Sequence, residues 1–161
     1  YGEVVGAAMT ADAYHLTATH PEGAGALQCM KFALEEAGLT MQDVDYLNAH
    51  ATSTPTGDLS EIKAISTLLD GNYKNLHISA TKSMTGHLLG AAGAIEAVFC
   101  VKAINEGVVP PTINTETLDP AIPQGIQIVT KAAIKKKVSV ALSNTFGFGG
   151  HNASVIFREF V

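Results

Sequence analysis

Cysteine, tryptophan and positive charge are all scarce in this sequence. Its 161 residues contain two cysteines, no tryptophan, and ten lysines and arginines against fifteen acidic residues, which gives a formal net charge of −5. Binding to nucleic acid requires a basic surface, and the lysine run at residues 135–137 is too short to provide one. We therefore expect no nucleic-acid partner, and we expect these lysines to protect the exposed end of the strand that follows them.

Long apolar runs and paired cysteines are absent as well. Gly, Lys, Glu or His interrupts every apolar run before the roughly 18 to 20 residues that cross a bilayer, so we expect no membrane partner. No basic segment leads into an apolar one near Tyr1, which argues against a signal peptide, and the start directly before a strand-like stretch suggests a piece of a longer protein. Cys29 and Cys100 fall inside helical patterns, which favours a reducing compartment, and neither has metal-ligand spacing to another Cys or His.

Helical patterns cover much of the sequence. With 47% hydrophobic and 16% charged residues the chain can bury a sizeable core, and we predict one domain over residues 1–161. Apolar residues three and four apart predict a helix over 21–38, and Asp58 followed by Glu61 resembles the N-terminal cap of a second helix that ends at Gly71. A third helix is predicted over 86–105. Its first turns hold almost only glycine and alanine, so we expect it to be central and buried against another backbone.

Strands are predicted over residues 44–48, 76–80, 126–129, 138–143 and 153–157, with a further strand-like stretch at 3–9. The prolines after Gly107 predict a long irregular connection, and residues 144–152 are expected to form a loop between the last two strands. Strands that alternate with helices early and pair with each other late predict an α/β layered fold with a mixed five-stranded sheet.

Residues able to do chemistry gather in three segments, each at the end of a predicted strand, where sites in α/β sheets are usually built. They span residues 48–55 (NAHATSTP), 82–87 (KSMTGH) and 144–152 (NTFGFGGHN). Taken alone, His50 also fits a hydrogen-bonded structural role, and the Phe-Gly-Phe-Gly-Gly run also fits a hairpin loop with its rings in the core. His87 lies at the predicted helix N-terminus, where we expect the ring to stay neutral and donate one hydrogen bond to a carbonyl.

Together the three segments resemble the β-ketoacyl-[acyl carrier protein] synthases of the elongating, type II kind, which are thiolase-like condensing enzymes. The motifs N-A-H-x-T-S-T, K-S-x-x-G-H-x-x-G-A-x-G and N-x-F-G-F-G-G-x-N occur in the family's order and spacing, and the likeness covers essentially the whole chain. It implies the C-terminal half of a thiolase-like fold. Ala51 and His151 stand where many bacterial members have Gly and Thr, and both variants look like those of plastid-type synthases.

The resemblance implies a Cys-His-His site in which His50 and His87 donate hydrogen bonds to a thioester oxygen, with Lys82 as a support. The family's acyl-carrying cysteine lies in an N-terminal half that we expect to be missing here, because Cys29 and Cys100 look like small core residues. We therefore expect the isolated chain to be inactive and to act with the N-terminal half of the same synthase.

Further roles are implied by the same resemblance. Thr52 and Thr54 match residues that hydrogen-bond the phosphopantetheine arm of the donor, and Phe148 matches the gate to the acyl pocket, with Phe146 beside it. Glu96 matches a buried glutamate near the lysine; alone it also fits a solvated helix charge, but its apolar neighbours favour burial with a partner. In some members a monovalent cation is bound at the positions that match Asn48, Glu96, Ser143 and Asn144.

The implied reaction is fatty-acid chain elongation by decarboxylative Claisen condensation of malonyl-[acyl carrier protein] with an enzyme-bound acyl thioester. Acyl carrier protein is then a partner, the full enzyme is a homodimer, and no cofactor is expected beyond the carrier's phosphopantetheine. The expected location is the bacterial cytoplasm, or the plastid or mitochondrial matrix of a eukaryote. A thiolase acting on coenzyme A thioesters is one alternative, but it needs a late cysteine and none follows Cys100. A non-catalytic chain-length partner is another, although such chains often lose a histidine or the lysine.

Overall fold

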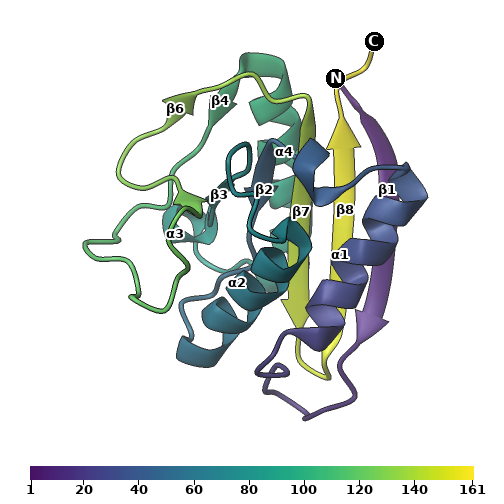
Figure 1. The fold of residues 1–161 in the computed structure, drawn as a ribbon, viewed down its shortest axis with the longest axis vertical. Helices are drawn as coiled ribbons and strands as arrows, with labels where there is room; N and C mark the ends of the chain where they lie inside the picture. Colours follow the sequence, from purple (N-terminus) through teal and green to yellow (C-terminus); the bar gives the residue numbers. More distant parts are fainter.

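A six-stranded mixed sheet forms the centre of the computed structural model, which describes all residues 1–161 (Figure 1). Its strand order is β1-β8-β7-β2-β3-β5. The bounds of these strands are β1 (Glu3–Ala11), β2 (Tyr46–Asn48), β3 (His77–Ser79), β5 (Gln127–Ile128), β7 (Val140–Gly147) and β8 (His151–Arg158). The run β7-β2-β3-β5 is parallel, whereas β8 pairs antiparallel with both β7 and β1.

The predicted α/β layers are confirmed, but the predicted number of five strands is wrong. The stretch at the start of the chain joins the sheet as its edge strand, pairing with β8 from Glu3 opposite Arg158 to Ala11 opposite His151. Two more short strands form a separate antiparallel ribbon: β4 (Val108–Val109) at the start of the connection that was expected to be irregular, and β6 (Ile134–Lys135) between the predicted strands 126–129 and 138–143.

Helices cover both faces of the sheet. In Figure 1, α1 (Ala24–Ala37) and α2 (Pro55–Leu69) lie in front of it, and α4 (Ala92–Glu106) lies behind β7 and β2. The remaining helical turns are short: α3 (Lys82–Thr85), η1 (Met41–Asp43) and η2 (Leu89–Ala91). None of these helices combines the length and apolarity that a membrane span requires.

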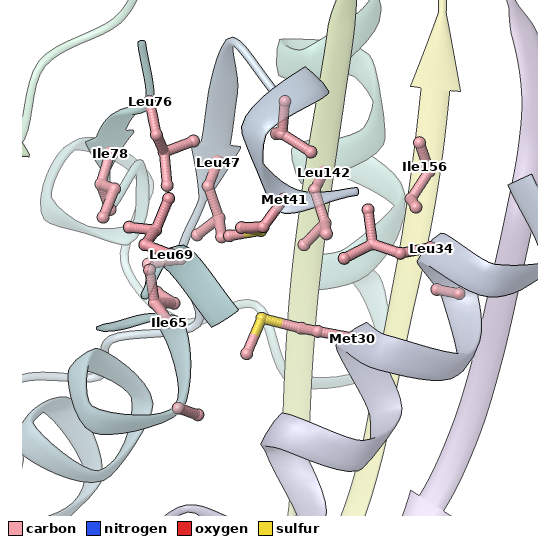
Figure 2. Packing of buried hydrophobic residues seen from close by; sticks show 14 of the residues in the cluster. Met30, Leu34, Met41, Leu47, Ile65, Leu69, Leu76, Ile78, Leu142 and Ile156 are labelled. Atoms are coloured by element: carbon pink, nitrogen blue, oxygen red, sulfur yellow. The ribbon is translucent and has the colours of Figure 1, made fainter. Parts of the chain in front are cut away.

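The main core lies between the sheet and the front helices. Figure 2 shows Met30 and Leu34 of α1 and Ile65 of α2 pointing toward Leu47 and Leu142 of the sheet. Each of these side chains is almost completely buried, and burial of one such side chain contributes about 1.5 to 3 kcal/mol. The core therefore fixes α1, α2 and the central strands as one layered body.

A smaller core lies under α4 and contains one of the two cysteines. Cys100 packs with Tyr46, Ala141 and Val109, while Cys29 of α1 lies on the other face and donates to the carbonyl oxygen of Ala8. Both thiols are fully buried, and burial raises the pKa of each above its ordinary value. The prediction that both cysteines are core residues is confirmed.

The helix predicted over residues 86–105 is wrong in its first part. The short helix α3 ends at Gly86, whose φ of 72° and ψ of 175° break the helix, and α4 begins only at Ala92. The residues between them lie on the surface, with the Leu89 side chain 74% exposed, and α4 buries one stripe that includes Glu96 and Cys100. Burial of the glycine-rich turns, which the small residues predicted, does not occur within this chain.

Two further boundaries differ from the prediction. Helix α2 begins at Pro55 with Thr54 as its N-cap residue, and the Asp58 carboxylate accepts the backbone N–H groups of Ser53 and Thr54. The predicted pairing of Asp58 with Glu61 as a cap is therefore wrong. Strands β7 and β8 continue into the expected loop and leave only residues 148–150 as its turn, where two glycines with positive φ reverse the chain.

Candidate functional site

Two histidines from different strand ends meet at one edge of the sheet. Strands β2 and β3 are parallel neighbours, so the segments that follow them leave the sheet on the same side. His50 follows β2 by two residues, and His87 comes directly after α3 and Gly86. Their ring centroids lie 5.4 Å apart with an interplanar angle of 87°, an edge-to-face arrangement.

His50 is held in a neutral state. Burial, the Lys82 ammonium and the His87 ring together lower its pKa from 6.5 to about 3. The Phe146 ring packs against His50 with the two ring centroids 5.5 Å apart. The Nδ1 atom of His50 is buried without a hydrogen-bond partner. A neutral imidazole carries one N–H, which can donate to an oxygen bound between the two rings.

Glu61 holds the loop that carries His50. Its carboxylate oxygens accept the backbone N–H groups of His50 and Ala51, each at 3.0 Å, and one oxygen also accepts the Asn144 side-chain N–H at 3.0 Å. Burial raises the pKa of this carboxyl, and the three donors oppose that rise. Sequence reasoning assigned Glu61 to a helix cap and missed this contact. The available signal was its position on the apolar stripe of α2, four residues before Ile65.

Lys82 and Glu96 form an ion pair in the interior. Lys82, the first residue of α3, reaches Glu96 on α4, and the two residues are 7% and 1% exposed. Burial raises the pKa of Glu96, while the hydrogen bond and the charge of Lys82 act in the opposite direction. The predicted burial of Glu96 with a partner is confirmed, and the same lysine places a positive charge near His50.

The four residues predicted for a monovalent cation are all buried. Two oxygens among them, Glu96 Oε2 and Ser143 Oγ, have no hydrogen-bond partner, whereas Asn48 bonds Thr81 and Asn144 bonds Glu61 and Ser154. Carboxylate, hydroxyl and amide oxygens are suitable ligands for a hard cation, so the donor set fits one. No group of three or more His, Cys, Asp or Glu side chains is placed to hold a metal ion.

The predicted substrate-binding residues line two cavities beside the histidines, both bordered by His87 and the smaller one also by His50. A cavity of about 670 Å³ is bordered by Thr52, Thr54, Phe146, Phe148 and both histidines. A larger one of about 1010 Å³ adjoins it and is bordered by Lys82, the same threonines and residues 112–119. Phe148, on the turn between β7 and β8, is 79% exposed at the opening, while Phe146 packs against the main core.

Comparison with known proteins agrees with this architecture. Residues 1–116 match the family described as "Beta-ketoacyl synthase, C-terminal domain". The chain is 49% identical over 160 residues to 3-oxoacyl-[acyl-carrier-protein] synthase 2 of Staphylococcus aureus (strain COL), and 51% identical over 160 residues to the protein of the same name in Synechocystis sp. (strain ATCC 27184 / PCC 6803 / Kazusa). Both matches cover 99% of this chain but only 38% of the relative's own length.

A solved structure gives the same answer for the fold. It is a type II polyketide ketosynthase bound to a hexaketide and in complex with its acyl-carrier protein, and it superimposes with a TM-score of 0.94 at 33% identity. The match covers 99% of this chain and 39% of the ketosynthase chain. The chain thus belongs to the β-ketoacyl synthase family, in which it corresponds to the C-terminal domain with its thiolase-like fold.

Proposed function

We propose that this chain supplies the histidine pair for the decarboxylative condensation that extends a chain on acyl carrier protein by two carbons. The observation that carries the proposal is the edge-to-face pair of His50 and His87, with His50 neutral at physiological pH. The names of the relatives from Staphylococcus aureus and Synechocystis support the same reaction class.

The geometry suits the decarboxylation step. When a malonyl thioester loses carbon dioxide, the electron pair of the broken C–C bond moves into an enolate whose charge collects on the thioester oxygen. N–H donors fixed on that oxygen lower the barrier, because they stabilise charge that develops only in the transition state. The enolate carbon then attacks the acyl thioester carbonyl, and the cysteine thiolate leaves. Lys82 contributes by keeping His50 neutral and by its ion pair with Glu96.

The nucleophile in this proposal comes from outside the chain. Cys29 and Cys100 are fully buried with raised pKa values, so neither can present a thiolate to an acyl group. The cysteine would lie in the part of the relatives that this chain does not match. Three exposed apolar side chains offer a surface on which that part can pack: Met9 of β1, Leu89 of η2 and Val98 of α4.

The remaining roles belong to the same proposal. Thr52 and Thr54 hydrogen-bond the phosphopantetheine arm, Phe148 gates the acyl pocket, and Glu96 with Ser143 helps to hold a monovalent cation. Acyl carrier protein delivers both substrates, and the assembled enzyme is a homodimer in the cytoplasm of a bacterium or in a plastid or mitochondrial matrix. The presence of His50, Lys82 and His87 argues against a non-catalytic chain-length partner.

A chimera tests the proposal. The 160 matching residues of the Staphylococcus aureus synthase are replaced by this chain, and release of carbon dioxide from malonyl-[acyl carrier protein] is measured together with β-ketoacyl product. The chimera should be active, and His50→Leu should lower kcat by about 10² to 10³ because one oxyanion donor is lost. His77→Leu is the matched control, since His77 begins β3 at the end away from the site. A folded chimera without decarboxylation, or full activity in His50→Leu, would refute the proposal.

A further inference from the structure

The backbone pairing between β2 and β3 stops before it reaches the catalytic loops. The ladder ends at Asn48 opposite Ser79, and its last bond runs from the Ala49 N–H to the Ser79 carbonyl at 2.9 Å. Beyond this point no backbone hydrogen bond joins the segment that leads to His50 to the one that leads to Lys82. The ladder therefore leaves the distance between these two segments undetermined.

A pair of buried side chains bridges the chains where the ladder ends. The Asn48 Nδ2 atom donates to Thr81 Oγ1 at 3.0 Å, and the Thr81 hydroxyl donates to Asn48 Oδ1 at 3.2 Å. Both residues are completely buried. The pair joins a residue two positions before His50 to the residue directly before Lys82.

Thr81 also occupies the N-cap position of α3, yet its hydroxyl makes no capping bond. A threonine at this position usually uses its side-chain oxygen to accept an N–H of the first turn. Here the carbonyl oxygen of Thr81 accepts the Met84 and Thr85 N–H groups, while the hydroxyl is turned to Asn48. The Thr81 side chain thus bonds the end of the neighbouring strand β2 and does not cap its own helix.

We propose that the Asn48–Thr81 pair is a positioning device that sets the distance between the His50 loop and the helix that carries Lys82 and leads to His87. Its effect on the rings can be measured in the chain alone, and only its effect on catalysis rests on the proposed function. Loss of the hydroxyl leaves the Asn48 carboxamide buried without its partner, so the two segments move apart to admit water or a new bond. A misplacement of about 1 Å at a reacting centre costs about 10² in rate.

Thr81→Val tests the device, because valine keeps the shape of threonine and removes the hydroxyl. Ser79→Ala is the matched control, since it deletes another buried cross-strand bond, to the Tyr46 hydroxyl, from the same two strands. In the 161-residue chain with labelled histidines, the nuclear Overhauser effect between the His50 and His87 rings should weaken in Thr81→Val and keep its intensity in Ser79→Ala and Thr81→Ser. In the chimera, Thr81→Val should lower kcat for malonyl decarboxylation about 10- to 100-fold with KM unchanged, and Thr81→Ser should restore it.

If Thr81→Val and Ser79→Ala had the same ring contact and the same kcat, the proposal would be overturned. The hydroxyl of Thr81 would then contribute to stability alone. If Thr81→Val does not fold, Thr81→Ser and Thr81→Cys replace it as a pair that differs only in the hydrogen-bonding atom, and equal ring contacts in the two would again overturn it. If the parent chimera shows no decarboxylation, the proposed function fails while the ring contact still decides the positioning role.

Discussion

Lowering the pH is expected to destabilise this fold through His50. In the unfolded chain the ring takes up a proton near its ordinary pKa of 6.5, whereas in the folded chain it does so only at about 3. The unfolded state therefore binds more protons between these values. The stability that the neutral ring preserves is fully present above pH 6.5 and is lost as the pH falls toward 3.

The size of this effect follows from the shift. Each pKa unit corresponds to about 1.4 kcal/mol, so the whole shift corresponds to about 5 kcal/mol, comparable to the total stability of a small domain. Glu61 and Glu96 act in the opposite direction, since their raised pKa values add stability as the pH falls through them. The total pH dependence of the chain therefore mixes both signs, and a variant is needed to isolate His50.

His50→Gln removes the titrating ring and leaves the two glutamates in place. The free energy of unfolding is measured by urea titration of the chain and of the variant from pH 7.5 to 4.5. As the pH falls from 6.5 to 4.5, the free energy of unfolding of the variant should rise by about 2 kcal/mol relative to that of the parent, because only the parent's unfolded state is stabilised by protonation at residue 50. His77→Gln should change the curve in the same direction but less, since burial lowers the pKa of a ring that lies partly in solvent. Parallel curves for His50→Gln and the parent would refute the claim that the fold holds His50 neutral.

Three further outcomes are expected. Lys82→Met should destabilise the chain by about 3 to 5 kcal/mol in urea unfolding, because Glu96 loses its partner in the interior. Adding Glu96→Gln should recover part of this lost stability. An unchanged urea midpoint in Lys82→Met would contradict the buried ion pair. In the chimera, Phe148→Ala should change the acylation rate or the preference among chain lengths and leave malonyl decarboxylation within about 2-fold, since Phe148 lies on the glycine-rich turn of residues 148–150. Identical acylation kinetics for several chain lengths would count against a gate. The 161-residue chain alone should give no β-ketoacyl product, and mass spectrometry should find no acyl group on Cys29 or Cys100; acylation of either would place the nucleophile in this chain.

Local patterns predicted the parts of this fold that depend on neighbouring residues. Helix α1 ends at Gly38, as its glycine predicted, and strands β2, β3 and β5 lie within the predicted ranges. The burial of Glu96 followed from the apolar residues on either side of it, and the first two motif segments follow β2 and β3 as expected. The third segment lies in the ends of β7 and β8 and the turn between them. Each of these features is determined by residues that are close together in the sequence, so a single sequence is enough to predict it.

The features that the sequence did not predict depend on distant partners. Strand β1 joins the sheet by pairing with β8, which lies at the other end of the chain, and no local pattern reports that pairing. The Glu61 side chain points toward the backbone N–H groups of the loop after β2, which it accepts as hydrogen-bond donors. The position of that loop depends on the whole sheet. Gly86 ends α3 by a backbone state that glycine permits but does not require, so the sequence alone also fits a continuous helix there.

The short central strands explain why so many polar side chains are buried beside this site. Strands β2 and β3 are only three residues long, so hydrogen bonds of the sheet cannot define the chain beyond them. Three side-chain links define it instead: the Glu61 carboxylate under the His50 loop, the Asn48–Thr81 pair between the strand ends, and the ion pair from Lys82 to α4. Buried polar groups of this kind often cost as much stability as they return, and apolar side chains of the same volume would pack as well. Their advantage is directional, because a hydrogen bond weakens steeply away from its preferred distance and angle, and all three links join segments that lead to the two imidazole rings, whose centroids lie 5.4 Å apart.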